Sequence, residues 1–208
     1  MKRSTLIARQ GRQPSGLLGE IVGRIMARET HAANLAALAM LDLAADDRVL
    51  EVGFGHGRTL AAAAKIVTRG RLAGVDPSSV MMGIARRRNA TPLRRGRMDL
   101  HLGTSQSLPF ADGVFDKAYA VHTIYFWSDP ERDLAEIARV LRPGGLLLLG
   151  FRSREDDAFV RNFPPEIYHI RSAGEVEGAI VAAGFSDVRT ESHRVGQATI
   201  CFSTASRQ

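Results

Sequence analysis

The sequence predicts an α/β protein in which a doubly wound, mostly parallel sheet carries helices on both faces. Between about residues 45 and 151, short apolar runs alternate with longer segments of helical periodicity, which is typical of parallel strands joined by helices. A turn with three alternating glycines connects the first of these runs to the helix behind it. Sheets of this kind bind ligands beyond the carboxyl ends of their strands, so we expect a nucleotide-like ligand beside that turn.

The length and composition suit one globular domain. The 208 residues are 45% hydrophobic and 24% charged, which is enough for an ordinary core. We expect residues 1–208 to form a single domain, with an N-terminal arm and covering helices over 1–44, a ligand-binding core over 45–151, and a helix and antiparallel strands over 152–208. The single cysteine, Cys201, excludes a disulfide framework. No set of His, Asp and Glu residues has the spacing of a zinc site, so we expect no metal.

Charge and hydropathy limit where the protein works and what it binds. No apolar run approaches the ~20 residues of a membrane span. The basic start, Met1–Gln13, lacks the apolar centre of a signal peptide, so we expect a cytoplasmic protein. The net charge is +6 and the pI about 10.2, with an arginine cluster over Arg86–Arg97. No nucleic-acid recognition motif accompanies this charge, so nucleic acid is not the expected partner.

Two helices are predicted ahead of the first strand. Residues 1–14 are basic and polar, and we expect them to form a flexible arm or a flap. Apolar residues at helical spacing predict helices from Pro14 to about Arg28 and from about His31 to Leu43. Helices at this position either cover a cofactor cleft or pad the sheet, and the sequence leaves both alternatives open.

The remaining elements follow from apolar runs and capping signals. Strands are predicted over residues 48–53, 71–76, 98–103, 114–121, 146–151, 186–194 and 197–204, and helices over 57–68, 79–89, 128–142 and 172–183. Ser128 and Glu131 have the spacing of a capping box, and so do Ser172 and Glu175. Residues 91–97 are predicted to form a loop. The last two strands are expected to pair antiparallel.

The spacing of the glycine turn discriminates between kinds of nucleotide ligand. The turn contains Gly53, Gly55 and Gly57, and Glu51 precedes it. A dinucleotide fingerprint needs its third small residue one position later, where this chain has Arg58. A P-loop needs a lysine directly after its glycines, and none follows here. The turn therefore matches neither the dinucleotide-binding fingerprint nor the P-loop.

Several further motifs follow the glycine turn in a fixed order. They are Val49–Gly57, Val75–Ser78, Gly103 with Ser107–Asp116, and Leu141–Gly145. Together they resemble the class I S-adenosylmethionine (SAM) dependent methyltransferases, and especially the small bacterial enzymes related to the ubiquinone/menaquinone C-methyltransferases. The resemblance implies a Rossmann-like, seven-stranded sheet that is parallel except for its last strand. It also implies SAM as the cofactor and S-adenosylhomocysteine as its product.

The resemblance implies a role for each matching residue. Glu51 is expected near the methionine end of SAM, where Gly53 and Gly55 offer bare backbone. Asp76 is expected to accept hydrogen bonds from both ribose hydroxyls, since a carboxylate has two acceptor oxygens. The expected cofactor-binding residues are Glu51, Gly53, Phe54, Gly55, Asp76, Pro77, Met81, Thr104, Ser105 and Val121.

One position departs from the family pattern. Where relatives often carry Asp after the glycine of the third strand, to reach the adenine amino group, this chain has Thr104 followed by Ser105. Either a hydroxyl or a backbone group makes that contact, or adenine is held mainly by packing against residues such as Met81.

An aromatic segment follows the fourth strand, where the chain of relatives runs past the transferable methyl group. His122, Tyr125 and the only tryptophan, Trp127, lie within six residues. The resemblance implies a substrate wall with His122 and Tyr125 as the catalytic residues, and with His122 as a general base or an orienting donor. The alternative is that Tyr125, Phe126 and Trp127 pack beneath the next helix.

We therefore expect a SAM-dependent methyltransferase that moves a methyl group to a small-molecule acceptor by in-line displacement. Two alternatives stay open: an RNA or DNA methyltransferase that uses the cluster Arg86–Arg97, and a non-catalytic SAM-binding partner protein. Residues 121–124 lack the Asn/Asp-Pro-Pro-Tyr/Phe motif of base aminomethylation, which counts against the first alternative. The sequence does not decide between a monomer and a homodimer formed through the N-terminal helices.

Overall fold

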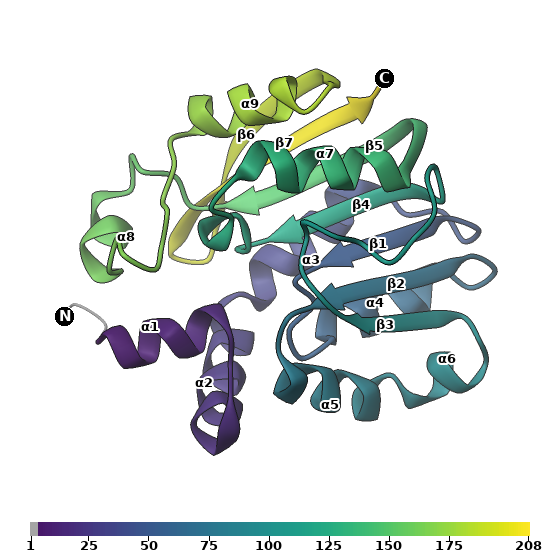
Figure 1. Cartoon of the computed structure of the whole chain (residues 1–208), viewed down its shortest axis with the longest axis horizontal. Coiled ribbons are helices and arrows are strands. Elements are labelled where there is room, and N and C mark those ends of the chain that lie inside the picture. The colour runs from purple at the N-terminus through teal and green to yellow at the C-terminus, as the bar shows by residue number, and fades with distance from the viewer. Residues whose placement is uncertain (1–3) are drawn as a thin grey trace.

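The computed structural model describes residues 4–208 and contains a seven-stranded sheet with helices on both faces (Figure 1). The strands are β1 (Arg48–Val52), β2 (Arg71–Asp76), β3 (Met98–Leu102), β4 (Phe115–Val121), β5 (Leu141–Phe151), β6 (Phe185–Val195) and β7 (Ala198–Arg207). The helices are α1 (Thr5–Arg12), α2 (Gly16–Glu29), α3 (His31–Leu41), α4 (Arg58–Ile66), α5 (Ser79–Arg88), α6 (Ala90–Arg94), the short η1 (Ile124–Phe126), α7 (Pro130–Val140), α8 (Asp157–Asn162) and α9 (Ala173–Ala182). Within residues 4–208, no helix has both the length and the apolar character that crossing a bilayer requires.

The strands lie in the order β3-β2-β1-β4-β5-β7-β6. Neighbours from β3 to β5 pair in parallel, and β7 is antiparallel to both β5 and β6. This confirms the predicted sheet, which is parallel except for its last strand. The carboxyl ends of β1, β2 and β4 therefore meet at one edge, and α1, α2 and α8 lie on that side in Figure 1.

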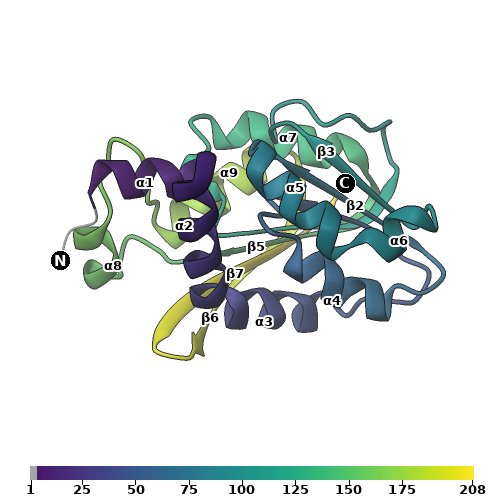
Figure 2. The ribbon, with the colours of Figure 1, turned by 90° about the horizontal axis from the view of Figure 1, so that it is seen from below.

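Alternate residues of the strands face two different helical layers. Val49 belongs to the core that α3, α4 and α5 cover, whereas Leu50 and Val52 belong to the core beneath α7 and α9. Figure 2 shows α3 and α4 on one side of the sheet and α7 and α9 on the other. Because both faces are buried, β1 is an almost continuous apolar run, and the buried Glu51 within it is an exception that calls for an explanation.

The N-terminal segment is helical where the sequence predicts a flexible arm. Residues 5–12 form α1, and the side chain of Ser4 caps it by accepting a hydrogen bond from the N–H of Ile7 at 3.4 Å. The chain then turns sharply into α2: a Cβ on Gly19 would lie 2.7 Å from the backbone of Pro14. This close packing stabilises a helix that the polar sequence alone does not predict. Residues 1–3 of the predicted arm lie outside the described residues.

Several local predictions need correction. Thr91–Arg97, predicted as a loop, is partly helical because α6 extends through Arg94. Helix α7 is capped by Asp129 and not by Ser128, because a proline occupies the first helical position and brings the side chain of Asp129 within 3.1 Å of a backbone N–H in the first turn. The capping box at Ser172 is confirmed.

Candidate active site

The turn after β1 adopts a conformation that favours glycine. Gly53, Gly55 and Gly57 have φ angles of 78°, 52° and 67°, which residues with a side chain rarely adopt. Two of them also approach neighbours closely: a Cβ on Gly53 would lie 2.2 Å from Thr123, and one on Gly57 would lie 2.8 Å from the Cβ of Ala85. The glycines therefore allow the turn to contact both the loop after β4 and helix α5.

A cavity of about 350 Å³ lies between this turn and the N-terminal helices, and we name it the glycine-turn cavity. Its volume is within the range of small-molecule sites, about 300–1,000 Å³. All of the predicted cofactor-binding residues line it: Glu51, Gly53, Phe54, Gly55, Asp76, Pro77, Met81, Thr104, Ser105 and Val121. Of the predicted catalytic pair, His122 lines it and Tyr125 does not.

Asp76 ends β2 and is only 6% exposed. Its Oδ2 accepts a hydrogen bond from the N–H of Gly55 at 2.8 Å, and its Oδ1 accepts one from the N–H of Ser78 at 2.9 Å. Burial raises the pKa of this carboxyl, and the two hydrogen bonds oppose the rise. Each oxygen has a second acceptor position, so the carboxylate can still accept two hydroxyls from a ligand.

Glu51 is 4% exposed, and its Oε2 accepts a hydrogen bond from the hydroxyl of Tyr119 at 2.9 Å. Burial raises the pKa of Glu51 to about 8, although the hydrogen bonds from Tyr119 and Thr59 lower it, and the nearby Asp76 adds to the rise. At neutral pH the free protein therefore holds this carboxyl mainly in its protonated form. A cationic ligand group nearby would favour the ionised form.

The loop after β3 brings in a residue that sequence analysis missed. Thr104 is exposed, whereas the hydroxyl of Ser105 is buried and donates to Oδ1 of Asp133. Gln106 Nε2 approaches Oδ2 of the same carboxyl at 3.4 Å. Asp133 is 1% exposed and lines the glycine-turn cavity. No signal separates Asp133 from the other acids of α7 in the sequence, because its burial depends on a loop 28 residues away.

The loop after β4 joins the two predicted catalytic residues. Nδ1 of His122 lies 3.0 Å from the hydroxyl oxygen of Tyr125, which also accepts the backbone N–H of Arg152 at 2.6 Å. Burial, and to a smaller extent the positive charge of Arg152, lower the pKa of His122 to about 4. The imidazole is therefore neutral, and a weak base, at neutral pH.

Tyr125 lines a second cavity of about 410 Å³, which we name the aromatic cavity. Met26, Thr30, His122 and Phe126 line both cavities, so the two spaces adjoin there. Trp127 lines only the glycine-turn cavity. The residues of the aromatic segment therefore divide between the two cavities.

Hydrogen bonds join the connection between α1 and α2 to the loop that follows Asp76. The side-chain amide of Gln13 donates to the carbonyl of Pro77 at 3.0 Å, and the hydroxyl of Ser78 donates to the carbonyl of Pro14. Both Gln13 and Pro14 line the glycine-turn cavity. The N-terminal helices therefore cover the cavity, and this answers the alternative that the sequence left open.

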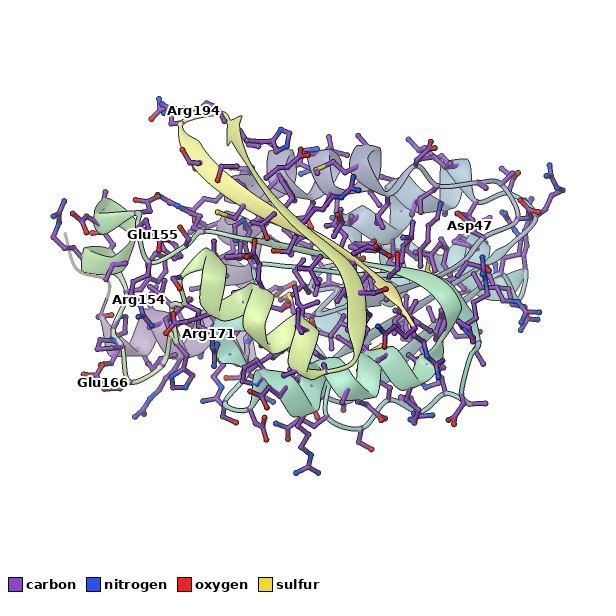
Figure 3. All side chains as sticks on the ribbon, turned by 90° about the horizontal axis from the view of Figure 1, so that it is seen from above. Asp47, Arg154, Glu155, Glu166, Arg171 and Arg194 are labelled. Atoms are coloured by element: carbon purple, nitrogen blue, oxygen red, sulfur yellow. The ribbon has the colours of Figure 1, made fainter. Side chains whose placement is uncertain are left out.

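Arg171 ties the loop after β4 to the segment before α9. Its guanidinium donates to the carbonyls of Ile124 at 3.0 Å and Trp127 at 2.8 Å. Figure 3 shows Arg171 and Glu155 towards one end of the molecule and Asp47 towards the other. Asp47 precedes β1 and Glu155 follows β5, so the end of the molecule that holds Glu155 is the one at the carboxyl ends of the parallel strands. The segment with Arg171 lies at this end, where the two cavities also lie.

A sheet of this topology with a cavity beside its first strand is typical of an α/β ligand-binding protein, and comparison with known proteins gives its family. The model of the methyltransferase domain family matches residues 50–149. The chain is 31% identical over 169 residues to the uncharacterized methyltransferase YdaC of Bacillus subtilis, a match that covers 81% of this chain and 87% of that protein. It is 35% identical over 116 residues to the demethylmenaquinone methyltransferase of Symbiobacterium thermophilum, but this match spans only 46% of that enzyme and 55% of this chain.

Solved structures share the whole fold. A putative methyltransferase of Haloferax volcanii, in complex with the Trm112 methyltransferase activator, superposes with a TM-score of 0.77 at 20% identity over 99% of both chains. A SAM-dependent methyltransferase of Thermotoga maritima, named as a possible histamine N-methyltransferase, gives a TM-score of 0.69 at 26% identity over 89% of this chain and 96% of that one. The chain belongs to the SAM-dependent methyltransferase family, as its motifs predict.

The residues of the glycine-turn cavity fit SAM by their chemistry. SAM carries a cationic sulfonium and an ammonium group, and the buried carboxyls Glu51 and Asp76 line the cavity. Its ribose offers two neighbouring hydroxyls, which suit the free acceptor positions of Asp76. Within residues 4–208, no three His, Cys, Asp or Glu side chains are grouped in a way that could hold a metal ion.

Proposed function

We propose that this methyltransferase acts on a small-molecule acceptor and works in the cytoplasm. The observation that carries the proposal is the aromatic cavity, which adjoins the glycine-turn cavity at His122 and Phe126. Its volume of about 410 Å³ and its walls from α2, α8 and the β6–β7 hairpin suit a compact molecule better than a nucleic-acid strand or a protein surface.

Bound SAM supplies a methyl group that the positive charge on sulfur has already activated. The task of the protein is then to hold cofactor and acceptor in line. Asp76 fixes the ribose, the bare backbone of Gly53 and Gly55 borders the methionine end, and Glu51 compensates its positive charge. Orientation of this kind contributes ~7–11 kcal/mol to catalysis in favourable cases.

Calorimetry with S-adenosylhomocysteine tests the cofactor half of the proposal. Asp76→Ala removes acceptors for two charge-assisted hydrogen bonds, each worth about 1.5–3 kcal/mol, so we expect its affinity to fall by at least about a hundredfold. Asp99→Ala removes an exposed carboxyl of β3 and serves as the matched control, with unchanged affinity. The proposal fails if the wild-type protein gives no binding heat, or if Asp76→Ala binds as tightly as the control.

Radiolabelled SAM tests the acceptor half. The purified protein is incubated with methyl-labelled SAM and with separate small-molecule, RNA, DNA and protein fractions of a cell extract. We expect label to enter the small-molecule fraction. Label that enters only RNA, DNA or protein would contradict a small-molecule acceptor.

A further inference from the structure

We propose that the aromatic cavity is the acceptor site and that it takes a planar aromatic molecule that presents an ionised hydroxyl to Nε2 of His122. The inference rests on the proposed function, because an acceptor site beside the cofactor is needed only if the protein transfers the methyl group of SAM. It is carried by three features of the cavity: its aromatic walls, the hydrogen bonds of His122 and the charge of Arg152.

Aromatic side chains form much of the cavity wall. Tyr125, Phe126, Phe159, Phe163 and Tyr168 all line it. The ring centroid of Phe163 lies 4.5 Å from those of both Phe159 and Tyr168, so these rings hold one another in fixed orientations. Flat faces with fixed orientations favour a flat conjugated ligand, which packs on them in offset or edge-to-face contact.

Hydrogen bonds determine which nitrogen of His122 carries the proton. The hydroxyl oxygen of Tyr125 accepts the backbone N–H of Arg152 at 2.6 Å, and a backbone amide can only donate. The other partner of this hydroxyl is Nδ1 of His122 at 3.0 Å, so the hydroxyl proton is donated to Nδ1. A neutral imidazole then carries its own proton on Nε2.

Nε2 of His122 faces open space. It makes no hydrogen bond to residues 4–208 and yet retains accessible surface, and the residue lines both cavities. His122 therefore presents an N–H to the acceptor and not a lone pair. Of the two roles that the sequence left open, this geometry favours the orienting donor over the general base.

One cationic side chain, Arg152, also lines the cavity and lies close enough to His122 to lower its pKa. The guanidinium of Arg152 lies 4.4 Å from the ring centroid of Phe159. It forms an ion pair with Asp156, in which Nε donates to Oδ2 at 2.9 Å, and this carboxylate offsets part of its charge. The acidic residue in the lining is Glu29, which is exposed at the end of α2. A phenolate or enolate oxygen can accept the N–H of His122, and because it is already ionised, no base is needed to remove its proton.

Absorbance titration with 4-nitrophenol tests the inference, because this planar phenol is yellow only when ionised. At neutral pH and with S-adenosylhomocysteine present, we expect the wild-type protein to bind 4-nitrophenol and to increase its yellow colour. Ala198→Phe adds a ring to a residue that lines the aromatic cavity alone, so nitrophenol binding should weaken by about tenfold or more. Thr199→Phe adds the same ring at the next residue of β7, which lines neither cavity, and should leave binding unchanged.

Calorimetry with S-adenosylhomocysteine on the same samples separates the two hypotheses. If the wild-type protein does not bind it, the proposed function is wrong. Suppose that the wild type, Ala198→Phe and Thr199→Phe all bind S-adenosylhomocysteine equally. If they also bind nitrophenol equally, or if the wild type binds nitrophenol only in its colourless form, the proposed acceptor site is wrong and the methyltransferase assignment stands. His122→Ala should lose the increase in colour while it still binds S-adenosylhomocysteine measurably; a colour increase that persists would overturn the role of His122.

Discussion

At the scale of single residues, we expect the buried carboxyl of Glu51 to lose a proton when a cationic ligand binds. Burial raises the pKa of both Glu51 and Asp76 in the ligand-free protein. A cationic ligand favours the ionised carboxylates and so acts in the opposite direction. We therefore expect a proton to be released when SAM binds in the glycine-turn cavity. This release can be measured without any acceptor present.

We expect SAM binding to release a proton near pH 7, mainly from Glu51, whose pKa is about 8 in the free protein. Affinity should then rise as the pH increases towards about 8 and level off above it, since ionisation no longer opposes binding. Calorimetry in buffers of different ionisation enthalpy counts the released protons. Glu51→Gln should abolish the release that depends on this residue, and an unaltered proton count in that variant would contradict the prediction.

The hydrogen bond between Tyr125 and His122 predicts an NMR signature. The nitrogen shifts of His122 should report a neutral ring protonated at Nε2, with a pKa of about 4. Because this pKa lies below the ordinary value of 6.5, the residue favours unfolding as the pH falls from 6.5 towards 4. Tyr125→Phe should allow the other tautomer to appear. A wild-type spectrum dominated by the form protonated at Nδ1 would refute the assignment.

At the scale of elements, backbone contacts between distant segments hold the two cavities in shape. The loop after β4 depends on Arg171, and the α1–α2 connection depends on a close approach at Gly19. Neither residue lines the glycine-turn cavity or the aromatic cavity. Changes at these positions should therefore act on stability first and on ligand affinity through the displaced loops.

Arg171→Met keeps much of the side-chain length and removes the donors to two carbonyls of the loop after β4. We expect a loss of about 1–3 kcal/mol in the free energy of unfolding, because those carbonyls lose their partners. Arg161→Met, at an exposed position of α8, is the control and should change stability by less than about 0.5 kcal/mol. Urea unfolding measures both, and equal stabilities would show that the tie is dispensable.

Gly19→Ala should separate α1 from α2, since its Cβ would lie 2.7 Å from the backbone of Pro14. We expect a loss of about 1–3 kcal/mol in stability together with weaker binding of S-adenosylhomocysteine. Gly178→Ala in α9 meets no atom within 4 Å and should stabilise the protein by about 0.5–1 kcal/mol. If both variants behave alike in urea unfolding, the close approach at Gly19 does not stabilise the fold.

At the scale of the whole molecule, the cofactor should stabilise the fold because residues from both N-terminal helices and the sheet line its cavity. A ligand at 100 times its Kd contributes about 2.7 kcal/mol, and a chain of this size gains about 2–4 °C in Tm per kcal/mol. Scanning fluorimetry should therefore show S-adenosylhomocysteine raising Tm by about 5–10 °C. Asp76→Ala should lose most of this shift, and a shift of full size in that variant would contradict the role of Asp76.

Sequence reasoning predicted the sheet because its signals are local. The strand over residues 71–76 was predicted with the bounds that β2 has, since a buried strand shows as a short apolar run between turn signals. It failed for α1, whose helical state depends on packing against α2. It also placed a capping box at Ser128, where the neighbouring Asp129 competes for the same backbone groups.

The sequence by itself determined the family, the seven-stranded and mostly parallel sheet that the family implies, and the residues around the glycine turn, because these depend on spacings within short stretches of chain. Only the tertiary structure decided that Asp133 is buried beside Ser105, that Tyr125 and Trp127 line different cavities, and which way Tyr125 donates. The contact of Tyr125 with Arg152 spans 27 residues. Such contacts depend on where separate elements meet on the sheet, and a pattern within a short stretch of sequence cannot predict this.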